Sequence, residues 1–443
     1  MKDRWLSEFK SFSGILQAGG NAAPVTFCAC INQSGEVEFD FSPISLTQET
    51  SFIMSCWNSE GSKLNYFSLS GKSEDGTEFK TECLYFNSLE NGSSEGSGSY
   101  MSPSGGCKRA EFHRKLAEPV QKLLLRMHVK GFQNFHQLNS KCHLGSITMD
   151  GATTIVDPDI ITGCIVVQSD NMPTDLSVWR AEADKLLLHV QRVMSFASAT
   201  VLGMPVIEFY AGENLEVVTL SQSRQATAHM PTFHFLDQQP IFEAAVTNFF
   251  TPPFDVKNLF FAIEWFAMDS TYNEVRLVNA MTALENLVAS NLGDDDVLIR
   301  PSKEFDKTKR ELRKVIKVCI AKWSINEDEK AKEVLVELNE KLGDLNRRPI
   351  LKKLYILADH WKVPLDGISK EKIKAAKKAR DRIIHRGHYY EDTSSGHDNL
   401  WEHVTVVREI VVRFLLTAIS YQGRYISHLG GYHHIQFPPQ EHL

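Results

Sequence analysis

The chain has 443 residues, with 48 Lys and Arg against 55 Asp and Glu, and a formal net charge of −7. This length allows two or three domains with separate cores, and the apolar and charged fractions are those of an ordinary soluble protein. The acidic balance argues against non-specific nucleic-acid binding by the whole molecule. Any contact with RNA must therefore come from local basic segments.

The sequence carries no membrane or secretion signal. No apolar run approaches the length that spans a bilayer, and the first residues, MKDRWLSE, lack the apolar core of a signal peptide. We therefore expect a cytoplasmic protein without membrane contact. The eight cysteines are dispersed without a C-x-x-C pair, which is typical of reduced thiols.

The first half of the chain has the residue composition and the turn spacing of a β domain. Short runs rich in β-branched and aromatic residues alternate with turn signals, and they predict a mostly antiparallel β-rich domain over residues 1–240. The Ser- and Gly-rich segment Glu90–Gly106 is interpreted as a long mobile loop. One helix, Leu176–Thr200, interrupts the strands. The predicted strands are Val25–Ile31, Val37–Phe41, Ser51–Trp57, Asn65–Leu69, Cys83–Phe86, Lys122–His128, Leu144–Met149, Ile160–Gln168, Pro205–Tyr210 and Leu215–Leu220.

After Pro240 the apolar spacing changes to three or four residues, which predicts an all-α bundle over residues 241–443. The expected fold class is α+β, with the β-rich domain followed by this bundle. The predicted helices are Ile241–Phe250, Val256–Met268, Tyr272–Asn291, Lys303–Trp323, Glu327–Leu342, Ile350–Trp361, Lys370–Arg386 and Asn399–Tyr421.

A zinc-binding site is one alternative interpretation of the first half of the chain. Its candidate ligands, between Cys107 and Cys164, include thiols and imidazoles, which suit zinc. Their spacings match no familiar pairwise ligand arrangement. We expect no metal and no cofactor.

The most informative segment is the helix predicted over Lys370–Arg386. Ser369 precedes it as an N-cap, and Gly387 follows it in the position where glycine commonly ends a helix. Its last turns carry Arg380, Asp381 and His385. A guanidinium, a carboxylate and an imidazole on one cationic helix are the groups needed to cut RNA without a metal ion.

The spacing of these groups suggests their roles. Asp381 and His385 are four residues apart, so the carboxylate is expected to hold the imidazole in one tautomer, while the helix-end carbonyls favour its cationic form. Arg380 is five residues from His385, about 140° around the helix, so the two side chains point to different sides. A symmetric homodimer would let both line one shared cleft.

In such a cleft His385 would move a proton at the ribose 2′-hydroxyl or the leaving 5′-oxygen, while Arg380 stabilises the charge on the phosphate. The substrate's own hydroxyl is the nucleophile, so RNA and not DNA is the expected substrate. Lys377, Lys378, Arg382 and Arg386 are the candidate RNA-binding residues. The alternative is that this is an ordinary solvated basic face, with the histidine only a charge partner of the helix end.

The sequence Arg380-Asp381-Arg382-Ile383-Ile384-His385-Arg386-Gly387 resembles the R-[N/D/H]-x-x-x-H signature of HEPN-domain ribonucleases, including the His-Arg-Gly ending frequent in their ApeA-like branch. Asn346–Leu354 resembles the lead-in of that branch, and Ala283-Leu284-Glu285 its early "A-L-E" helix. Glu285 either reaches the active cleft or supports a polar network between helices. The similarity covers about residues 254–425, and Asp381 stands where asparagine is common.

The resemblance implies an endoribonuclease of anti-phage defence by abortive infection. Its substrate would be RNA, tRNA among the candidates, and the domain over 1–240 would sense a trigger such as a phage protein. Two other classes remain open. A HEPN-like bundle can serve as a non-catalytic RNA-binding or scaffold protein, and the β-rich half could be a hydrolase for a small ligand, although its sequence carries no nucleophile elbow or phosphate loop.

Overall fold

The computed structural model describes residues 9–57, 66–94, 98–155, 157–222, 230–268, 270–323, 328–389 and 397–439. The chain divides into two compact units. The first is Met1–Thr251 with Ala267–Asp269, and the second is Pro252–Phe266 with Ser270–Leu443. The division therefore lies at Thr251/Pro252 and not at residue 240. The helix predicted from Ile241 belongs to the first unit, because it packs against that unit's sheet.

The strands of the first unit are β1 (Lys10–Ala18), β2 (Asn21–Ile31), β3 (Val37–Phe41), β4 (Ile44–Ser45), β5 (Phe67–Ser73), β6 (Glu78–Ser94), β7 (Gly98–Cys107), β8 (Arg109–Lys115), β9 (Leu124–Lys130), β10 (Leu138–Cys142), β11 (Gly145–Asp150), β12 (Ile161–Gln168), β13 (Gly203–Ala211) and β14 (Asn214–Leu220). Its helices are α1 (Ser51–Trp57), α2 (Leu176–Ser198) and α3 (Gln239–Thr247). All the strand pairings among these strands are antiparallel.

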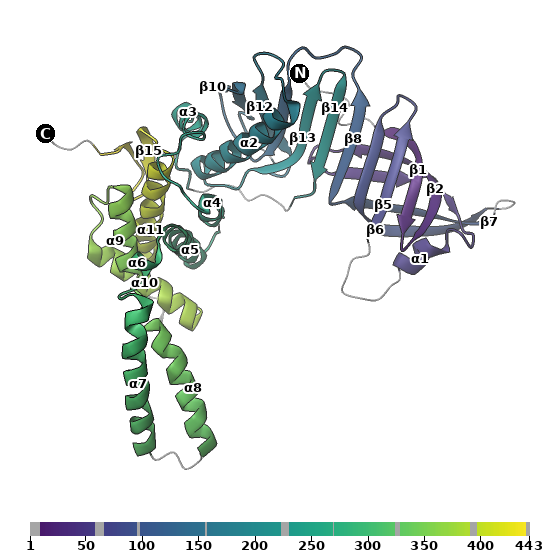
Figure 1. Ribbon diagram of the computed structural model, residues 1–443. Helices are drawn as coiled ribbons and strands as arrows, with labels where there is room; N and C mark the ends of the chain where they lie inside the picture. Colours follow the sequence, from purple (N-terminus) through teal and green to yellow (C-terminus); the bar gives the residue numbers. More distant parts are fainter. Residues whose placement is uncertain are drawn as a thin grey trace. The chain divides into compact units, whose positions relative to one another are not determined.

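Half of this unit is a closed ring of strands. The pairings run β6-β5-β1-β2-β3-β7, and β7 pairs again with β6 (Figure 1). Phenylalanine rings fill the interior: Phe12 stacks on Phe27 at 5.2 Å, and Phe79 meets Phe27 edge-on at 5.5 Å. Alternating side chains along each strand point inward, so apolar residues at every second position, phenylalanine among them, produce this core.

The other half is an open sheet in the order β10-β11-β12-β9-β13-β14-β8, which joins the ring through β6. The helix α2 packs on β12 and β9, and α3 packs on β10 and α2. Asp175 caps α2 by accepting from the backbone N–H groups of Ser177 and Val178. The predicted helix and the mostly antiparallel β-rich character of this half are thereby confirmed.

Two predictions for this unit are wrong. Ser51–Trp57 is the helix α1 and not a strand, since a short apolar run fits either structure. Most of the predicted loop Glu90–Gly106 is paired strand, because β6 and β7 form a long hairpin there. Glycine suits this pairing: a Cβ on Gly105 would lie 2.0 Å from the carbonyl oxygen of Tyr85.

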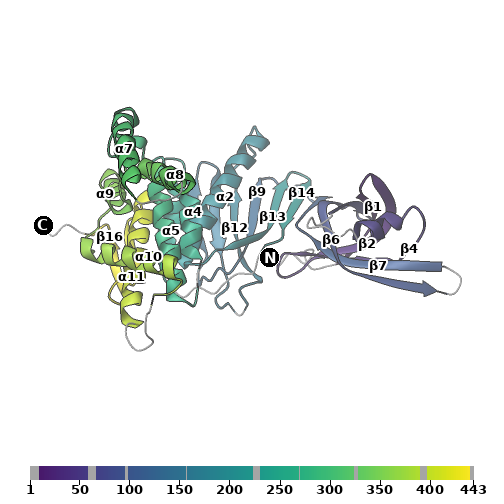
Figure 2. The ribbon, with the colours of Figure 1, turned by 90° about the horizontal axis from the view of Figure 1, so that it is seen from below.

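The second unit is mainly helical. Its helices are α4 (Leu259–Ala267, whose last residue is counted with the first unit), α5 (Asn273–Asn291), α6 (Asp294–Val297), α7 (Ser302–Lys322), α8 (Asp328–Asp344), α9 (Ile350–Trp361), α10 (Lys370–Arg386) and α11 (His397–Ala418). The core forms where α5 packs against α11, α10 and α9 (Figure 2). The α+β class is therefore confirmed.

The predicted all-α character of this unit fails at its end. After α11 the chain forms a hairpin of β15 (Gly423–Ser427) and β16 (His433–Phe437). A buried carboxylate ties this hairpin to α11: Glu409 accepts from Arg413 at 2.9 Å, from the Tyr425 hydroxyl at 2.5 Å and from Ser427 at 2.7 Å. Because buried charge is costly unless it is satisfied, these three donors explain why the segment is ordered.

In the part of the chain that is described, no helix has both the length and the apolar character required to cross a membrane.

The phenylalanine core should dominate the stability of the first unit. Phe27→Ala leaves a cavity among Phe12, Phe39 and Phe79, and it should destabilise the unit by about 3–5 kcal/mol, measured by urea unfolding followed by circular dichroism. Thr26→Ala, an exposed neighbour on the same strand, is the control and should change stability by less than about 0.5 kcal/mol. Equal effects of the two changes would contradict this account of the core.

Candidate active site on helix α10

Helix α10 begins and ends where the sequence places it. The Ser369 hydroxyl accepts from the backbone N–H of Lys372 at 3.3 Å, and Gly387 has φ +79° and donates its N–H to the carbonyl of Ile383 at 2.8 Å. Its buried face consists of Ile373, Ala376, Ala379 and Ile383, and α10 packs with it on α5 and α11. The remaining faces carry the polar residues.

Arg380 is anchored to the neighbouring helix. Its Nη2 donates to Oε2 of Glu285 on α5 at 2.7 Å, and its Nη1 lies 3.3 Å from Oδ1 of Asp381. The side chain is 22% exposed, so the arginine is partly buried between the two helices. Glu285 was expected either to reach the active cleft or to support a polar network between helices. The structure shows that it contacts Arg380, a candidate site residue, directly.

Asp381 does not hold His385, contrary to the expected carboxylate–imidazole pair. Its carboxylate instead contacts Lys377, one turn earlier, and Arg380. Burial raises the pKa of Asp381, but the hydrogen bonds and charges of Lys377 and Arg380 lower it by more, so the pKa lies below its ordinary value. Lys377 and Arg380 both bring a full positive charge within contact distance of this carboxylate, so it pairs with them.

His385 is exposed on the last turn of α10. Among the described residues it has no hydrogen-bond or ion-pair partner, so both ring nitrogens are open to an external group. An imidazole in this state can accept or donate a proton at a substrate, provided that a second surface brings the substrate to it.

The candidate RNA-binding residues differ in their surroundings. Lys378 and Arg386 are exposed, Lys377 is half-buried beside Asp381, and the guanidinium of Arg382 lies 5.7 Å from the centre of the Tyr389 ring. In total α10 carries eight Lys and Arg against two acidic residues, a net charge of +6. This helix is a local basic segment in an acidic chain.

The structure does not bring Arg380 and His385 into one site within a single chain. Arg380 faces α5, whereas His385 is exposed on a different side of α10. The shared site between two protomers stays a prediction.

The predicted lead-in has a structural role at its first residue. Asn346 is buried, and its side chain accepts from the N–H of Arg300 at 3.0 Å and donates to the carbonyl of the same residue at 2.8 Å. It therefore joins the segment before α7 to the segment before α9. Ala283 and Leu284 are buried in the core, which leaves Glu285 as the member of its triplet that reaches the site.

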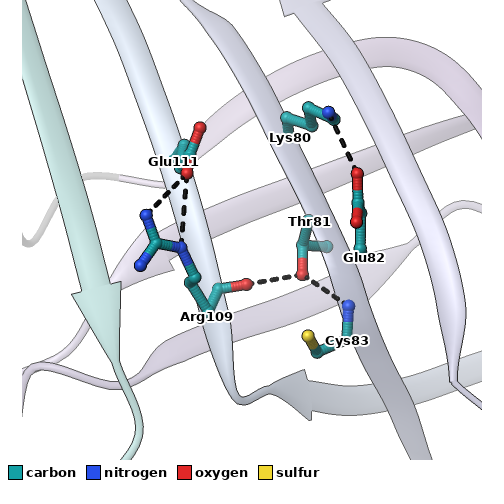
Figure 3. A pocket seen from close by; sticks show the side chains of 6 residues that line it. All are labelled: Lys80, Thr81, Glu82, Cys83, Arg109 and Glu111. Atoms are coloured by element: carbon teal, nitrogen blue, oxygen red, sulfur yellow. Dashed lines mark hydrogen bonds and ion pairs between the residues drawn. The ribbon is translucent and has the colours of Figure 1, made fainter.

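Two pockets of the first unit bear on the small-ligand hydrolase. The larger, of about 420 Å³, has His113 and Glu216 in its lining and leaves this alternative open. The other, of about 170 Å³, gives it no support and is lined by Lys80, Thr81, Glu82, Cys83, Arg109 and Glu111 (Figure 3). Its charges pair with each other, Lys80 with Glu82 at 3.1 Å and Arg109 with Glu111 at 2.8 Å. The Thr81 hydroxyl donates to the Arg109 carbonyl at 2.6 Å, and the lining holds no histidine to activate a nucleophile.

The zinc alternative also finds no site in the described ranges, where no group of three His, Cys, Asp or Glu side chains is placed to hold a metal ion. His128 instead lies 3.0 Å from Glu208, a fully buried carboxylate that Arg126 also contacts at 3.0 Å. The Cys164 thiol donates to Asp150 at 3.2 Å, and burial together with the Asp150 charge raises its pKa to about 12. These residues form a charged cluster of the sheet and not a thiolate nucleophile.

Comparison of the chain with protein-family models, with curated proteins and with solved structures gave no match.

The ion pairs of Asp381 should depend on pH in a defined direction. Because its pKa is lowered in the folded state, the pairs stabilise the protein above the unfolded pKa of about 3.9, and this contribution is lost as the pH falls through the folded value. Asp381→Asn should therefore lower stability by less than about 1 kcal/mol at pH 7, a small effect because the pair is partly exposed. Urea unfolding at pH 7 and at about pH 3 measures the difference, which should shrink in acid. A difference that grows on acidification would contradict the assignment.

Proposed function

We propose that the chain is a metal-independent endoribonuclease of the HEPN type, whose active site combines Arg380 and His385 from two protomers. The observation that carries the proposal is the state of these two side chains. A guanidinium is fixed by Glu285, and an exposed imidazole has no partner among the described residues, both on a helix of net charge +6. The R-x4-H spacing and its resemblance to HEPN ribonucleases add to this.

The chemistry needs only these groups and the substrate. His385 takes the proton of a ribose 2′-hydroxyl, the 2′-oxygen attacks the adjacent phosphorus, and the bond to the 5′-oxygen breaks as that oxygen gains a proton. The products are a 2′,3′-cyclic phosphate and a 5′-hydroxyl. Arg380 stabilises the negative charge that develops on the non-bridging oxygens.

The carboxylates around Arg380 define how a phosphate would reach it. Glu285 holds Nη2 at 2.7 Å, whereas the contact of Nη1 with Asp381 is longer, at 3.3 Å. A phosphate oxygen would displace the weaker contact, and Lys377 would keep Asp381 paired. In this proposal Glu285 is a positioning residue, Asp381 adjusts local charge, and Lys378, Arg382 and Arg386 attract the RNA backbone.

The biological role follows from the resemblance alone. An RNA-cleaving enzyme of abortive infection would act in the cytoplasm, remain silent until infection, and then damage cellular RNA, with tRNA among its candidate targets. A separate compact unit supplies a natural place for control, because a change in the relative pose of two protomers would separate Arg380 from His385. The proposed trigger, a phage-derived protein, would bind the first unit.

One observation favours a second candidate, a non-catalytic RNA-binding or scaffold protein. Arg380 is neutralised by two carboxylates, so its charge is already compensated before any phosphate arrives. In that case α10 would bind RNA through Lys378 and Arg386 without cutting it.

Replacement of the imidazole separates the two candidates. His385→Ala should reduce RNA cleavage at least about 1,000-fold, since it removes the proton-transfer group, while RNA binding at low salt persists. The measurement is incubation of the purified full-length protein with total RNA in EDTA, followed by mapping of cut sites and of cyclic phosphate ends.

His360→Ala is the matched control, because His360 is also a partly exposed histidine on a helix of the second unit. It should leave cleavage unchanged. A wild-type protein that binds RNA but does not cut it would favour the scaffold, and a strict requirement for magnesium would contradict the proposed chemistry.

A further inference from the structure

Helix α7 has an apolar surface wider than one neighbouring helix can cover. Its apolar positions run from Val318 through Val315, Leu312 and Ile316 to Ile320, an arc of about 200° at 100° per residue. A helix that packs on one partner usually needs an apolar stripe about half as wide. The width of this apolar arc therefore indicates that α7 packs against more than one helix.

The helix α8 covers only one side of this arc. The two helices form a hairpin (Figure 1), and of the residues of α7 only Ile320 is buried. Leu312 and Ile316 are half-buried along the contact, while Val315 and Val318 are 58% and 55% exposed. An apolar face of this kind on a charged, amphipathic helix is a typical protein contact surface.

The two helices of the hairpin carry opposite charge. Helix α7 has eight Lys and Arg against three acidic residues, a net charge of +5, whereas α8 has three Lys against six acidic residues, a net charge of −3. A second copy of the hairpin, related by a two-fold axis, can place each α7 beside the α8 of the other protomer. The surface is therefore complementary to itself, both in apolar character and in charge.

We propose that the bare face of the α7–α8 hairpin, centred on Val315 and Val318, is a self-association surface, and that its occupant is the same hairpin of a second copy. The two hairpins form an antiparallel four-helix bundle in which each α7 packs between its own α8 and that of the partner. Bundles of this kind bury the apolar seams that a two-helix hairpin leaves open.

The size of the hairpin is adequate for a stable dimer. At 1.5 Å per residue, α7 is roughly 30 Å long, which matches the length of ordinary four-helix bundles. Two such hairpins packed along their length can reach the roughly 1,200–2,000 Å² of buried surface that stable interfaces use.

This inference deepens the proposed function, on which its biological meaning rests, because it names a surface through which two protomers meet. The association itself requires no RNA and none of the residues assigned to cleavage. It can therefore fail or succeed independently of the ribonuclease proposal.

The test is the mass of the full-length protein in solution, measured by light scattering after size exclusion. Wild type should be a dimer of about 100 kDa, twice the 50.1 kDa chain. Val315→Asp/Val318→Asp places four carboxylates in the interface of the dimer, so its dissociation constant should rise at least about 100-fold. Both residues are exposed in the single chain, so the monomer should keep its circular dichroism spectrum.

Arg313→Asp is the matched control. Arg313 is exposed on the side of α7 opposite the two valines, about 170° away, and its replacement changes the charge by −2, as the valine pair does. The control should remain dimeric. A monomeric wild type would overturn the inference, and so would a double valine variant that dimerises as wild type does. If the wild type is monomeric and binds RNA, and the double valine variant does not bind RNA, the occupant of this face is RNA instead.

A second measurement uses Cys319, which is exposed beside the two valines. Its alkylation by iodoacetamide, followed by peptide mapping, should slow about tenfold at protein concentrations where the dimer forms, and it should not slow in the valine variant. An unchanged rate in wild type would overturn the proposed face.

The outcomes for cleavage are separate. His385→Ala should keep the dimer. A wild-type protein that dimerises through the hairpin but does not cut RNA contradicts only the proposed function. A double valine variant that stays dimeric and cuts RNA as wild type does contradicts only the hairpin inference.

Discussion

The ion pair between Arg380 and Glu285 connects the fold of the second unit to its candidate chemistry. It joins α10 to α5, the helix around which the core of that unit is built, and it fixes the motif arginine against the bundle. With the guanidinium held there, Lys378, His385 and Arg386 of the same helix are exposed to solvent. In the proposed mechanism a phosphate would approach a guanidinium that is already oriented and partly compensated by carboxylates.

This arrangement places a limit on the single chain. In the proposed mechanism Arg380 and His385 act on one phosphate, yet they lie on different sides of α10. The proposed mechanism therefore requires a second surface, because of the rotation of the helix between the two residues. The charge asymmetry between α7 and α8, a separate feature of the same unit, offers a place where a partner can attach.

Local signals made much of this fold predictable, and non-local contacts explain the failures. The ends of α10 were predictable because Ser369 and Gly387 act within one turn of the helix. Ser51–Trp57 was misassigned because seven residues are too few to establish a period. The strands β6 and β7 were missed because composition describes the residues of a segment and not what lies beside them.

The candidate site shows the same division. The sequence identifies Arg380, Asp381 and His385 as neighbours on one helix, but the contacts of each depend on the folded structure. Glu285 lies 95 residues before Arg380, and no local pattern decides whether it meets that arginine or a different helix. Lys377 was assigned to RNA, yet its position one turn before Asp381 makes it the partner that takes the carboxylate away from His385.

The carboxylate of Glu409 has a practical consequence for the design of truncated proteins. Two of its three donors come from β15, near the end of the chain, while the carboxylate itself is in the middle of the longest core helix of the second unit. Truncated proteins that stop after α11 would therefore remove the hydroxyl donors of Tyr425 and Ser427 from a carboxylate that is buried in the core. A shortened domain boundary chosen from helix predictions alone would damage the interior, although the deleted segment looks peripheral in the sequence.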